Sequence, residues 1–143
     1  MSDDYIPSPS EWVADQVKRY EATDGADGGE LNGLACIVIT YKGRKTAATR
    51  KMALMKVQDG ANYVFVASMG GAPNNPQWYH NLLDGPDVTV QDYADIHEMR
   101  ARLVDDADEK APLWAAAVAA YPPYDEYQER TERVIPVFLA EPV

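Results

Sequence analysis

The chain has 143 residues, of which 46% are hydrophobic, and its 23 acidic and 13 basic side chains give a formal net charge of -10. This length and composition fit one folded domain and exclude a disordered chain. The negative charge excludes general nucleic-acid binding, because contact with a phosphate backbone requires a basic surface. No apolar run approaches the roughly 18 residues of a membrane-spanning helix, so we expect no stable membrane insertion.

Cysteine usage and the N-terminus indicate the compartment. Cys36 is the single cysteine, so no disulfide can form within the chain, and its place in an apolar run predicts a buried structural thiol. The N-terminal segment "MSDDYIPSPSEW" carries acids and lacks the apolar stretch of a secretory signal peptide. We therefore expect a cytoplasmic protein.

Hydrophobic periodicity and turn residues predict the elements in chain order. A helix is expected over residues 7–25, capped by Ser8 or Ser10, and a flexible glycine-rich connector follows up to residue 33. Apolar runs predict the strands, which cover residues 34–41, 49–57, 63–69, 87–93, 96–104 and 134–142. Turn signals at Asp59-Gly60 and near residues 94–95 join neighbouring strands as antiparallel hairpins.

Three further helices complete the prediction. A short one follows the glycine turn at residues 70 and 71, with Asn75 as its N-cap and Pro76 in its first turn. The others cover residues 105–121, where acids favour the helix start, and residues 122–133. Antiparallel strands surrounded by short helices define an α+β protein with a small barrel-like sheet. We divide the chain into an N-terminal helix with its connector, residues 1–33, and a barrel domain, residues 34–143.

One segment opposes the charge of the whole chain. Between Lys42 and Lys56 there are six basic residues and no acidic one, and the segment starts in the loop between two predicted strands. Guanidinium, ammonium and hydroxyl groups at the end of a sheet suit a phosphate or carboxylate ligand. A solvated basic turn is the alternative interpretation.

Two other motifs could contribute to a binding site. In "ASMGGAPNNPQWYHN", a strand leads into Gly70 and Gly71 and then a helix start, so backbone amides can face an anion or a polar ring edge. An ordinary turn with a helix cap is the alternative. In "YPPYDEY", Tyr121, Tyr124 and Tyr127 recur every three residues, and they either line a pocket for a flat polar molecule or pack in the core.

The sequence lacks side-chain motifs for catalysis without a cofactor. His80, His97 and Cys36 form no metal-ligand pattern, so we expect no metal site. No GxSxG, GxGxxG or Walker lysine pattern occurs. If the protein is an enzyme, a cofactor must supply the difficult chemistry.

Taken together, "GRKTAATRKMAL", "VFVASMGGAPNNPQWYHNL" and "YPPYDEYQERTERVIPVFLAEP" closely resemble the deazaflavin-dependent nitroreductase family, over a region from about Leu34 to Pro142. Members of that family are split β-barrels that use coenzyme F420, a deazaflavin that carries a phosphodiester and several carboxylates. The resemblance implies the same fold and cofactor here. The chain departs from residues frequent in the family at Met69, Ala53 and Met55, and this alters the substrate pocket.

The resemblance also implies the site residues. Arg44, Lys45 and Thr46 match the loop that holds the phosphate and oligoglutamate tail of the cofactor. The remaining cofactor positions match Arg50, Lys51, Met52, Ala53, Leu54, Met55, Val66, Ala67, Ser68, Met69, Gly70, Gly71, Gln77, Trp78, Tyr79, His80 and Asn81. The substrate pocket matches Met55, Ser68, Tyr121, Tyr124 and Tyr127, of which Ser68 and the three tyrosines are the candidate catalytic residues.

The expected activity is hydride transfer from reduced F420 to an electron-poor double bond, in enones, unsaturated lactones, quinones or nitro compounds. Tyr124 is the first candidate for the proton or hydrogen-bond donor, with solvent as the alternative proton source. Two other functions stay open, an FMN-binding split-barrel oxidoreductase and a non-catalytic F420 carrier or storage protein. We expect a small-molecule substrate as partner and a chain that is a monomer or a homodimer.

Overall fold

The computed structural model describes the chain except for residues 1–4, 6, 8–9, 32 and 46. Four α-helices and one 3-10 turn accompany eight strands. The helical elements are α1 (Glu11–Thr23), η1 (Met69–Gly71), α2 (Gln77–Asp84), α3 (Ala107–Ala120) and α4 (Pro123–Glu129). The strands are β1 (Glu30–Leu31), β2 (Leu34–Lys42), β3 (Thr49–Met55), β4 (Gln58–Asp59), β5 (Asn62–Val66), β6 (Asp87–Asp92), β7 (Asp95–Leu103) and β8 (Val137–Pro142).

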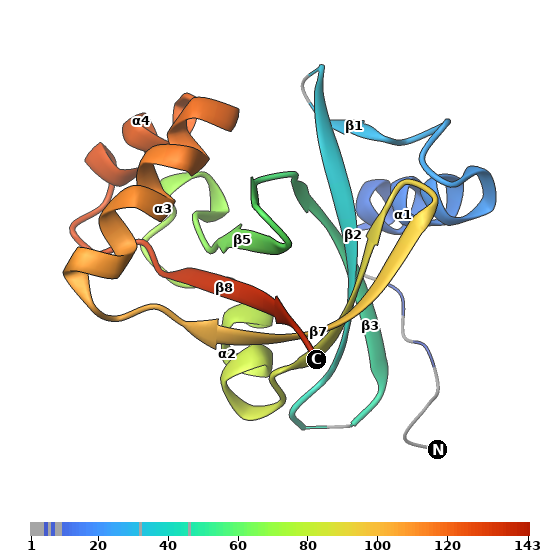
Figure 1. Cartoon of the computed structure of the whole chain (residues 1–143). Coiled ribbons are helices and arrows are strands. Elements are labelled where there is room, and N and C mark those ends of the chain that lie inside the picture. The colour runs from blue at the N-terminus through green and yellow to red at the C-terminus, as the bar shows by residue number, and fades with distance from the viewer. Residues whose placement is uncertain (1–4, 6, 8–9, 32, 46) are drawn as a thin grey trace.

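The strands form one antiparallel sheet that curls into a half-barrel (Figure 1). Neighbouring strands follow the order β1-β2-β6-β7-β8-β5-β4, and β3 pairs with β2. Among the described strands no ladder joins β3 to β4 or β5, so the barrel is split between β3 and the β4–β5 pair. The structure therefore confirms the predicted α+β class and the barrel-like sheet. The six longer strands are those expected from the sequence, and β1 and β4 are additional two-residue strands.

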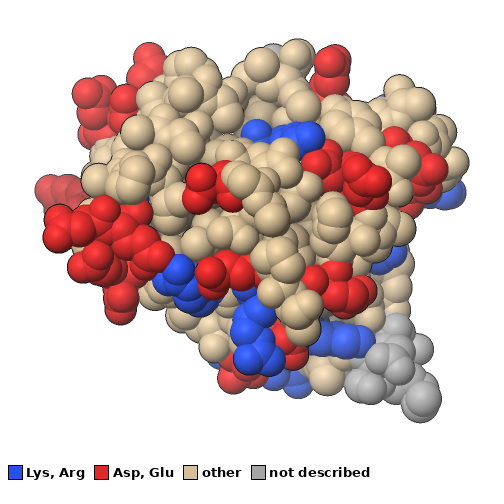
Figure 2. All heavy atoms as spheres, in the orientation of Figure 1, with Lys and Arg blue, Asp and Glu red and all other residues tan. Residues whose placement is uncertain are grey.

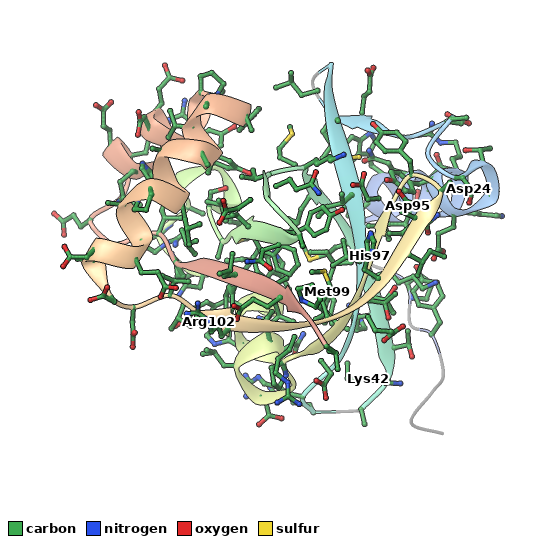
Figure 3. The ribbon with its side chains drawn as sticks, in the orientation of Figure 1. Asp24, Lys42, Asp95, His97, Met99 and Arg102 are labelled. Carbon is green, nitrogen blue, oxygen red and sulfur yellow. The ribbon has the colours of Figure 1, made fainter. Side chains whose placement is uncertain are left out.

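Side-chain alternation along the strands divides the apolar residues into three clusters. The barrel interior holds Ile37 and Ile39 of β2 with Phe65 and Phe138, and Trp78 and Leu82 of α2 close one end of it. Met99 of β7 belongs to this interior, whereas Arg102 of the same strand lies on the outside (Figure 3).

The other two clusters lie on the outer faces of the sheet. Helices α3 and α4 cover one face, where Leu113 and Tyr124 meet Val64 and Leu139. Helix α1 covers β2 and β3, where Val17 and Tyr20 meet Cys36 and Val38. Cys36 has no exposed surface, and burial raises the pKa of its thiol to about 11, which confirms the predicted buried structural thiol.

The connector before β2 packs closely against the rest of the chain. Gly25 and Gly29 are buried, and a Cβ on Gly25 would lie 2.3 Å from the Tyr93 ring. Residues of β1 pair with the start of β2, and Gln16 of α1 donates to the carbonyls of Gly28 and Glu30 at 3.0 and 3.2 Å. The division at residue 33 stays a prediction, although α1 and the sheet share a core.

Helix caps follow the sequence in part. Ser10 caps α1, since its Oγ accepts from the N–H of Val13 at 3.5 Å, and Ser8 lies outside the described residues. Helix α3 has acidic residues in its first turn, as predicted, and its N-cap is Asp106, which was not predicted; Gly85 is the C-cap of α2. The predicted N-cap of α2 is wrong, because Pro76 occupies the N-cap position. The side chain of Asn75 instead accepts a hydrogen bond from Arg133. None of the described helices is long and apolar enough to cross a membrane.

Candidate functional site

The basic loop joins β2 to β3 and lies beside α2 at one end of the barrel (Figure 1). Lys42 ends β2 at this rim (Figure 3). The backbone N–H of Arg44 donates to Oδ1 of Asn81 at 3.0 Å, so helix α2 fixes the start of the loop. Gly43 and Ala48 close its base with a 2.9 Å backbone hydrogen bond. Two predicted cofactor segments, distant in the sequence, are therefore in direct contact, whereas Thr46 lies outside the described residues.

Ion pairing decides which cations of the basic segment are available to a ligand. Nζ of Lys51 lies 2.5 Å from Oε2 of Glu21, and Nζ of Lys56 lies 3.0 Å from Oδ2 of Asp92. In the part of the chain that the structure describes, Arg44, Lys45 and Arg50 form no ion pair, and Arg44 and Lys45 are exposed.. Fewer cations are thus available to a ligand than the six basic residues of this segment suggested.

The rest of the surface emphasises this contrast. On the face drawn in Figure 2, acidic side chains gather at the left, over the start of α3, and most of the blue side chains there lie next to red ones. The arginines of β7 are paired in this way, Arg100 with Asp87 at 3.1 Å and Arg102 with Glu109 and Glu141. Uncompensated cations in an acidic protein attract an anion to their own location.

A small cavity of about 290 Å³ lies between the loop and α2. It is lined by Arg44, His80, Leu83 and Asp84. His80 is half-buried and its ring meets the edge of Tyr79, with 5.0 Å between the ring centroids. The cavity is large enough for one phosphate or carboxylate group, and Arg44 is the cation at its wall.

Strand β3 presents its predicted site residues on two opposite faces. Met52 and Leu54 are half-buried and pack against the barrel interior, and Arg50 shares their side of the strand beside Tyr41. Lys51 and Ala53 face α1 instead, where Lys51 meets Glu21 and Ala53 packs beside Val38. The side chains of Lys51 and Ala53 therefore point away from the other predicted cofactor residues of this strand.

The glycine turn after β5 adopts a left-handed backbone. Met69, Gly70 and Gly71 have φ angles of 47°, 65° and 80°. A Cβ on Gly71 would lie 2.6 Å from the carbonyl oxygen of Tyr127, whereas one on Gly70 would meet nothing within 4 Å. Gly71 is thus required by its contact with α4, which fixes the tyrosine segment against the turn.

The sequence did not predict the role of Arg133, whose side chain forms hydrogen bonds with the backbone of this turn. Its guanidinium donates to the carbonyl oxygens of Ala72 at 2.8 Å, Ala67 at 3.2 Å and Ser68 at 2.7 Å, and to Oδ1 of Asn75 at 2.8 Å. The arginine follows α4 in the sequence, 61 to 66 residues after the backbone carbonyls that it binds. No local sequence pattern predicts such a contact, because it depends on how α4 and β8 pack at the end of β5.

The three tyrosines lie together in the hydrophobic cluster that α3 and α4 form with the sheet, and their role in a substrate pocket stays a prediction. The hydroxyls of Tyr121 and Tyr127 are 2.9 Å apart, and the rings of Tyr121 and Tyr124 meet edge to face at 4.9 Å. Met55 and Val66 belong to the same cluster, which brings the ends of β3 and β5 to the aromatic wall. Met55 and the three tyrosines therefore share one mostly buried cluster, as the core-packing interpretation expects, and Ser68 is not part of it.

Tyr124 and Tyr127 differ in exposure. Tyr124 is only 5% exposed, and burial raises the pKa of its hydroxyl well above the ordinary value. Tyr127 is half-buried, and its hydrogen bond to Tyr121 raises the pKa of its hydroxyl. Burial makes Tyr124 a poorer proton donor than a free phenol, and it lies among apolar side chains.

The described residues contain no group of three His, Cys, Asp or Glu side chains that could hold a metal ion. The site thus consists of a cationic rim, the split edge of a barrel and an aromatic wall beside a glycine turn. This combination is that of a split-barrel protein with a cationic rim suited to an anionic ligand.

Comparison with known proteins identifies the family. Residues 12–142 match the model of the F420H(2)-dependent quinone reductases, and the chain belongs to this family. The F420H(2)-dependent quinone reductase Rv1261c of Mycobacterium tuberculosis is 36% identical over 123 residues, which are 84% of this chain and 83% of the relative. Rv3178 of the same species is 38% identical over 106 residues, which are 74% of this chain and 88% of that protein.

Solved structures agree in fold. An F420-H2 dependent reductase, FDR-A, has 40% sequence identity and a TM-score of 0.69, with 74% of this chain and 93% of that chain covered. A structure described as a domain-swapped dimer has 39% identity and a TM-score of 0.73, with 94% and 100% covered. These relationships confirm the split-barrel fold, the oxidoreductase class and reduced coenzyme F420 as the cofactor.

Proposed function

We propose that this protein uses reduced F420 to reduce quinones and related flat acceptors, including conjugated enones, unsaturated lactones and nitro compounds. The observation that carries the proposal is that Arg44, Lys45 and Arg50, at the rim of an acidic barrel next to α2, form no ion pair with any described residue. A polyanionic cofactor needs such a patch, because the net charge of -10 would otherwise repel it. Family membership supports quinones as the first substrate class.

The residues present fit the cofactor in two parts. Arg44, Lys45 and Arg50 would hold the phosphodiester and the carboxylates, since guanidinium groups match both anions and Lys45 adds a point charge. Met52 and Leu54 of β3, together with the turn after β5, would hold the apolar ring at the split edge of the barrel. When bound, the reduced deazaflavin supplies a hydride, and the protein supplies binding, orientation and electrostatics.

The tyrosine wall would orient the substrate. Aromatic side chains bind a flat acceptor on an apolar surface. When the hydroxyl of Tyr127 accepts from Tyr121, its own proton can be donated to a carbonyl where negative charge develops. Ser68 is a second donor at the same edge of β5. Tyr124 packs against the rings of Tyr121 and Tyr127 and keeps them in place. Solvent supplies the proton that completes the reduction.

We also propose that the protein is a homodimer. The support is the similar chain described as a domain-swapped dimer, which this chain matches over 94% of its length.

Titration of the purified protein with F420 and with FMN tests the cofactor. We expect micromolar F420 to change the fluorescence of the mixture on binding. Tight FMN binding without F420 binding would contradict the proposal. Oxidation of reduced F420 on addition of each acceptor class then tests the activity. Silence across quinones, enones, lactones and nitroaromatics would favour a carrier protein.

A further inference from the structure

Helix α1, the glycine-rich connector and β1 form one N-terminal unit, residues 11–31, that lies at one side of the curled sheet (Figure 1). The side-chain amide of Gln16 in α1 donates to the carbonyl oxygens of Gly28 and Glu30, so the helix and the connector hold each other. The chain leaves this unit through a single turn, between the end of β1 and the start of β2. The unit can therefore move as a whole if this turn opens.

The contacts that hold α1 on the barrel join residues that are distant in the sequence. The Tyr20 hydroxyl donates toward the carbonyl oxygen of Cys36 at 3.1 Å and accepts from the N–H of Tyr93 at 2.7 Å. Oε2 of Glu21 meets Nζ of Lys51 at 2.5 Å. Tyr20 has no exposed surface, so α1 must be docked on a barrel in the folded protein. The same contacts form whether the helix belongs to the same copy of the chain or to a second copy.

The geometry of the β1–β2 hairpin allows such an exchange. The two strands pair antiparallel, with Glu30 opposite Ala35 and Leu31 opposite Leu34, which leaves two residues in the turn. When the turn straightens, the two turn residues of one copy continue the same register opposite the two turn residues of another copy. The short hairpin of each copy then becomes part of one unbroken antiparallel ladder over residues 30–35 of both chains.

Gly33 distinguishes the closed turn from the open one. Its φ angle is 78° in the closed turn, and a Cβ at this position would meet nothing within 4 Å. Only the left-handed backbone therefore favours glycine here, and an extended hinge has no such requirement. Short turns of this kind are typical hinges for the exchange of a terminal element.

We propose that two copies of this chain exchange their N-terminal units, so that α1 of each copy packs on β2 and β3 of the other. The exchange rests on the homodimer proposed above. Met52 lies on the face of β3 toward the barrel interior, whereas Lys51 and Ala53 lie on the face that α1 covers. In the dimer, Glu21 of the second copy pairs with Lys51. The strand that carries the predicted cofactor residues of each copy is thus supported by the helix of the other.

Zero-length cross-linking of Lys51 to Glu21 with a carbodiimide tests the exchange directly, because the reagent joins an amine and a carboxylate that are already in contact. Equal amounts of unlabelled and ¹⁵N-labelled protein are unfolded together, refolded, cross-linked and digested. About half of the Lys51–Glu21 peptides should combine a light and a heavy chain if partners exchange at random. Glu21→Gln removes the link and identifies the peptide by mass spectrometry.

Single-isotope peptides alone, from a protein that light scattering shows to be dimeric, would overturn the exchange and leave the homodimer standing. A monomeric wild-type protein would overturn both. Neither measurement involves F420, so absence of F420 binding would overturn only the reductase function.

A glycine substitution provides a second test. Gly33→Ala should lower the dimer dissociation constant by about tenfold or more, because the positive φ is costly for alanine in the closed turn and absent from the extended hinge. Gly60→Ala is the matched control, since Gly60 lies in the β4–β5 turn with φ 62° and a Cβ there would also meet nothing within 4 Å. Its dimer dissociation constant should stay within about threefold of wild type. Equal constants for the two variants, measured by analytical ultracentrifugation, would contradict opening of the β1–β2 turn.

Discussion

Nζ of Lys51 lies 2.5 Å from Oε2 of Glu21, although Lys51 directly follows Arg50 in the basic segment. Adjacent residues of a strand face opposite sides of a sheet, so Lys51 meets α1 while Arg50 shares the other face with Tyr41. The two cations therefore have different roles, and mutation can separate them.

Replacement of Arg44, Lys45 and Arg50 together by alanine should weaken F420 binding by about 10- to 100-fold, because several exposed charge contacts act in parallel. Lys51→Ala should leave the F420 dissociation constant within about threefold of wild type, since its charge is already paired. The matched control for net charge is the triple variant Arg19→Ala, Arg100→Ala and Arg102→Ala. Fluorescence titration measures all three, and unchanged affinity in the loop variant would refute the assignment of the cationic rim.

Gly71→Ala should destabilise the protein by about 2–4 kcal/mol, because the new Cβ would lie 2.6 Å from the Tyr127 carbonyl oxygen in a left-handed conformation. Gly70→Ala should cost only about 1 kcal/mol, since its Cβ would meet open space and only the positive φ opposes it. Urea unfolding of both variants measures the difference. Equal losses would show that the contact between α4 and the turn is looser than the structure indicates.

Tyr127→Phe should lower kcat for a quinone by about tenfold, because it removes one member of the hydroxyl pair at the substrate wall. Tyr124→Phe should have a smaller effect, since Tyr124 is buried among apolar side chains and burial raises the pKa of its hydroxyl. Steady-state kinetics with saturating reduced F420 compares the two variants. A larger loss in Tyr124→Phe would restore Tyr124 as the donor.

Stability should fall at alkaline pH because of Cys36. Burial raises the pKa of its thiol to about 11 in the folded protein, whereas an exposed thiol titrates near 8.5. The folded state keeps its proton longer, so this contribution is complete below about pH 8.5 and is lost as pH rises through about 11. Each pH unit in that window costs up to about 1.4 kcal/mol.

Urea unfolding at pH 8, 9.5 and 10.5 measures this dependence, with Cys36→Ala as the matched variant. The variant should show a shallower decrease of the free energy of unfolding over the same range. Thiol reagents provide a second check, since Cys36 has no exposed surface and should react in the native protein only through unfolding. An identical pH slope in the two proteins would mean that the thiol ionises as easily in the folded state.

Local sequence patterns were sufficient for the architecture of this protein. Alternating and continuous apolar runs predicted the six longer strands, Ser8 or Ser10 and the acidic run from residue 105 predicted two helix starts, and the motifs from the basic loop to the tyrosines predicted the family. These features depend on residues close together in the chain, whose spacing matches the geometry of a strand, a turn or a helix cap. They could therefore be read without knowledge of the fold.

Only the tertiary structure determined which of those side chains remain available for ligand binding or helix capping. Lys51 and Lys56 are neutralised by Glu21 and Asp92, partners from α1 and β6 that no local pattern connects to them. Asn75 caps no helix because Arg133, 58 residues later, binds its side chain. Charge, burial and hydrogen bonding of a side chain depend on which distant segments pack against it, and that arrangement exists only in the folded chain.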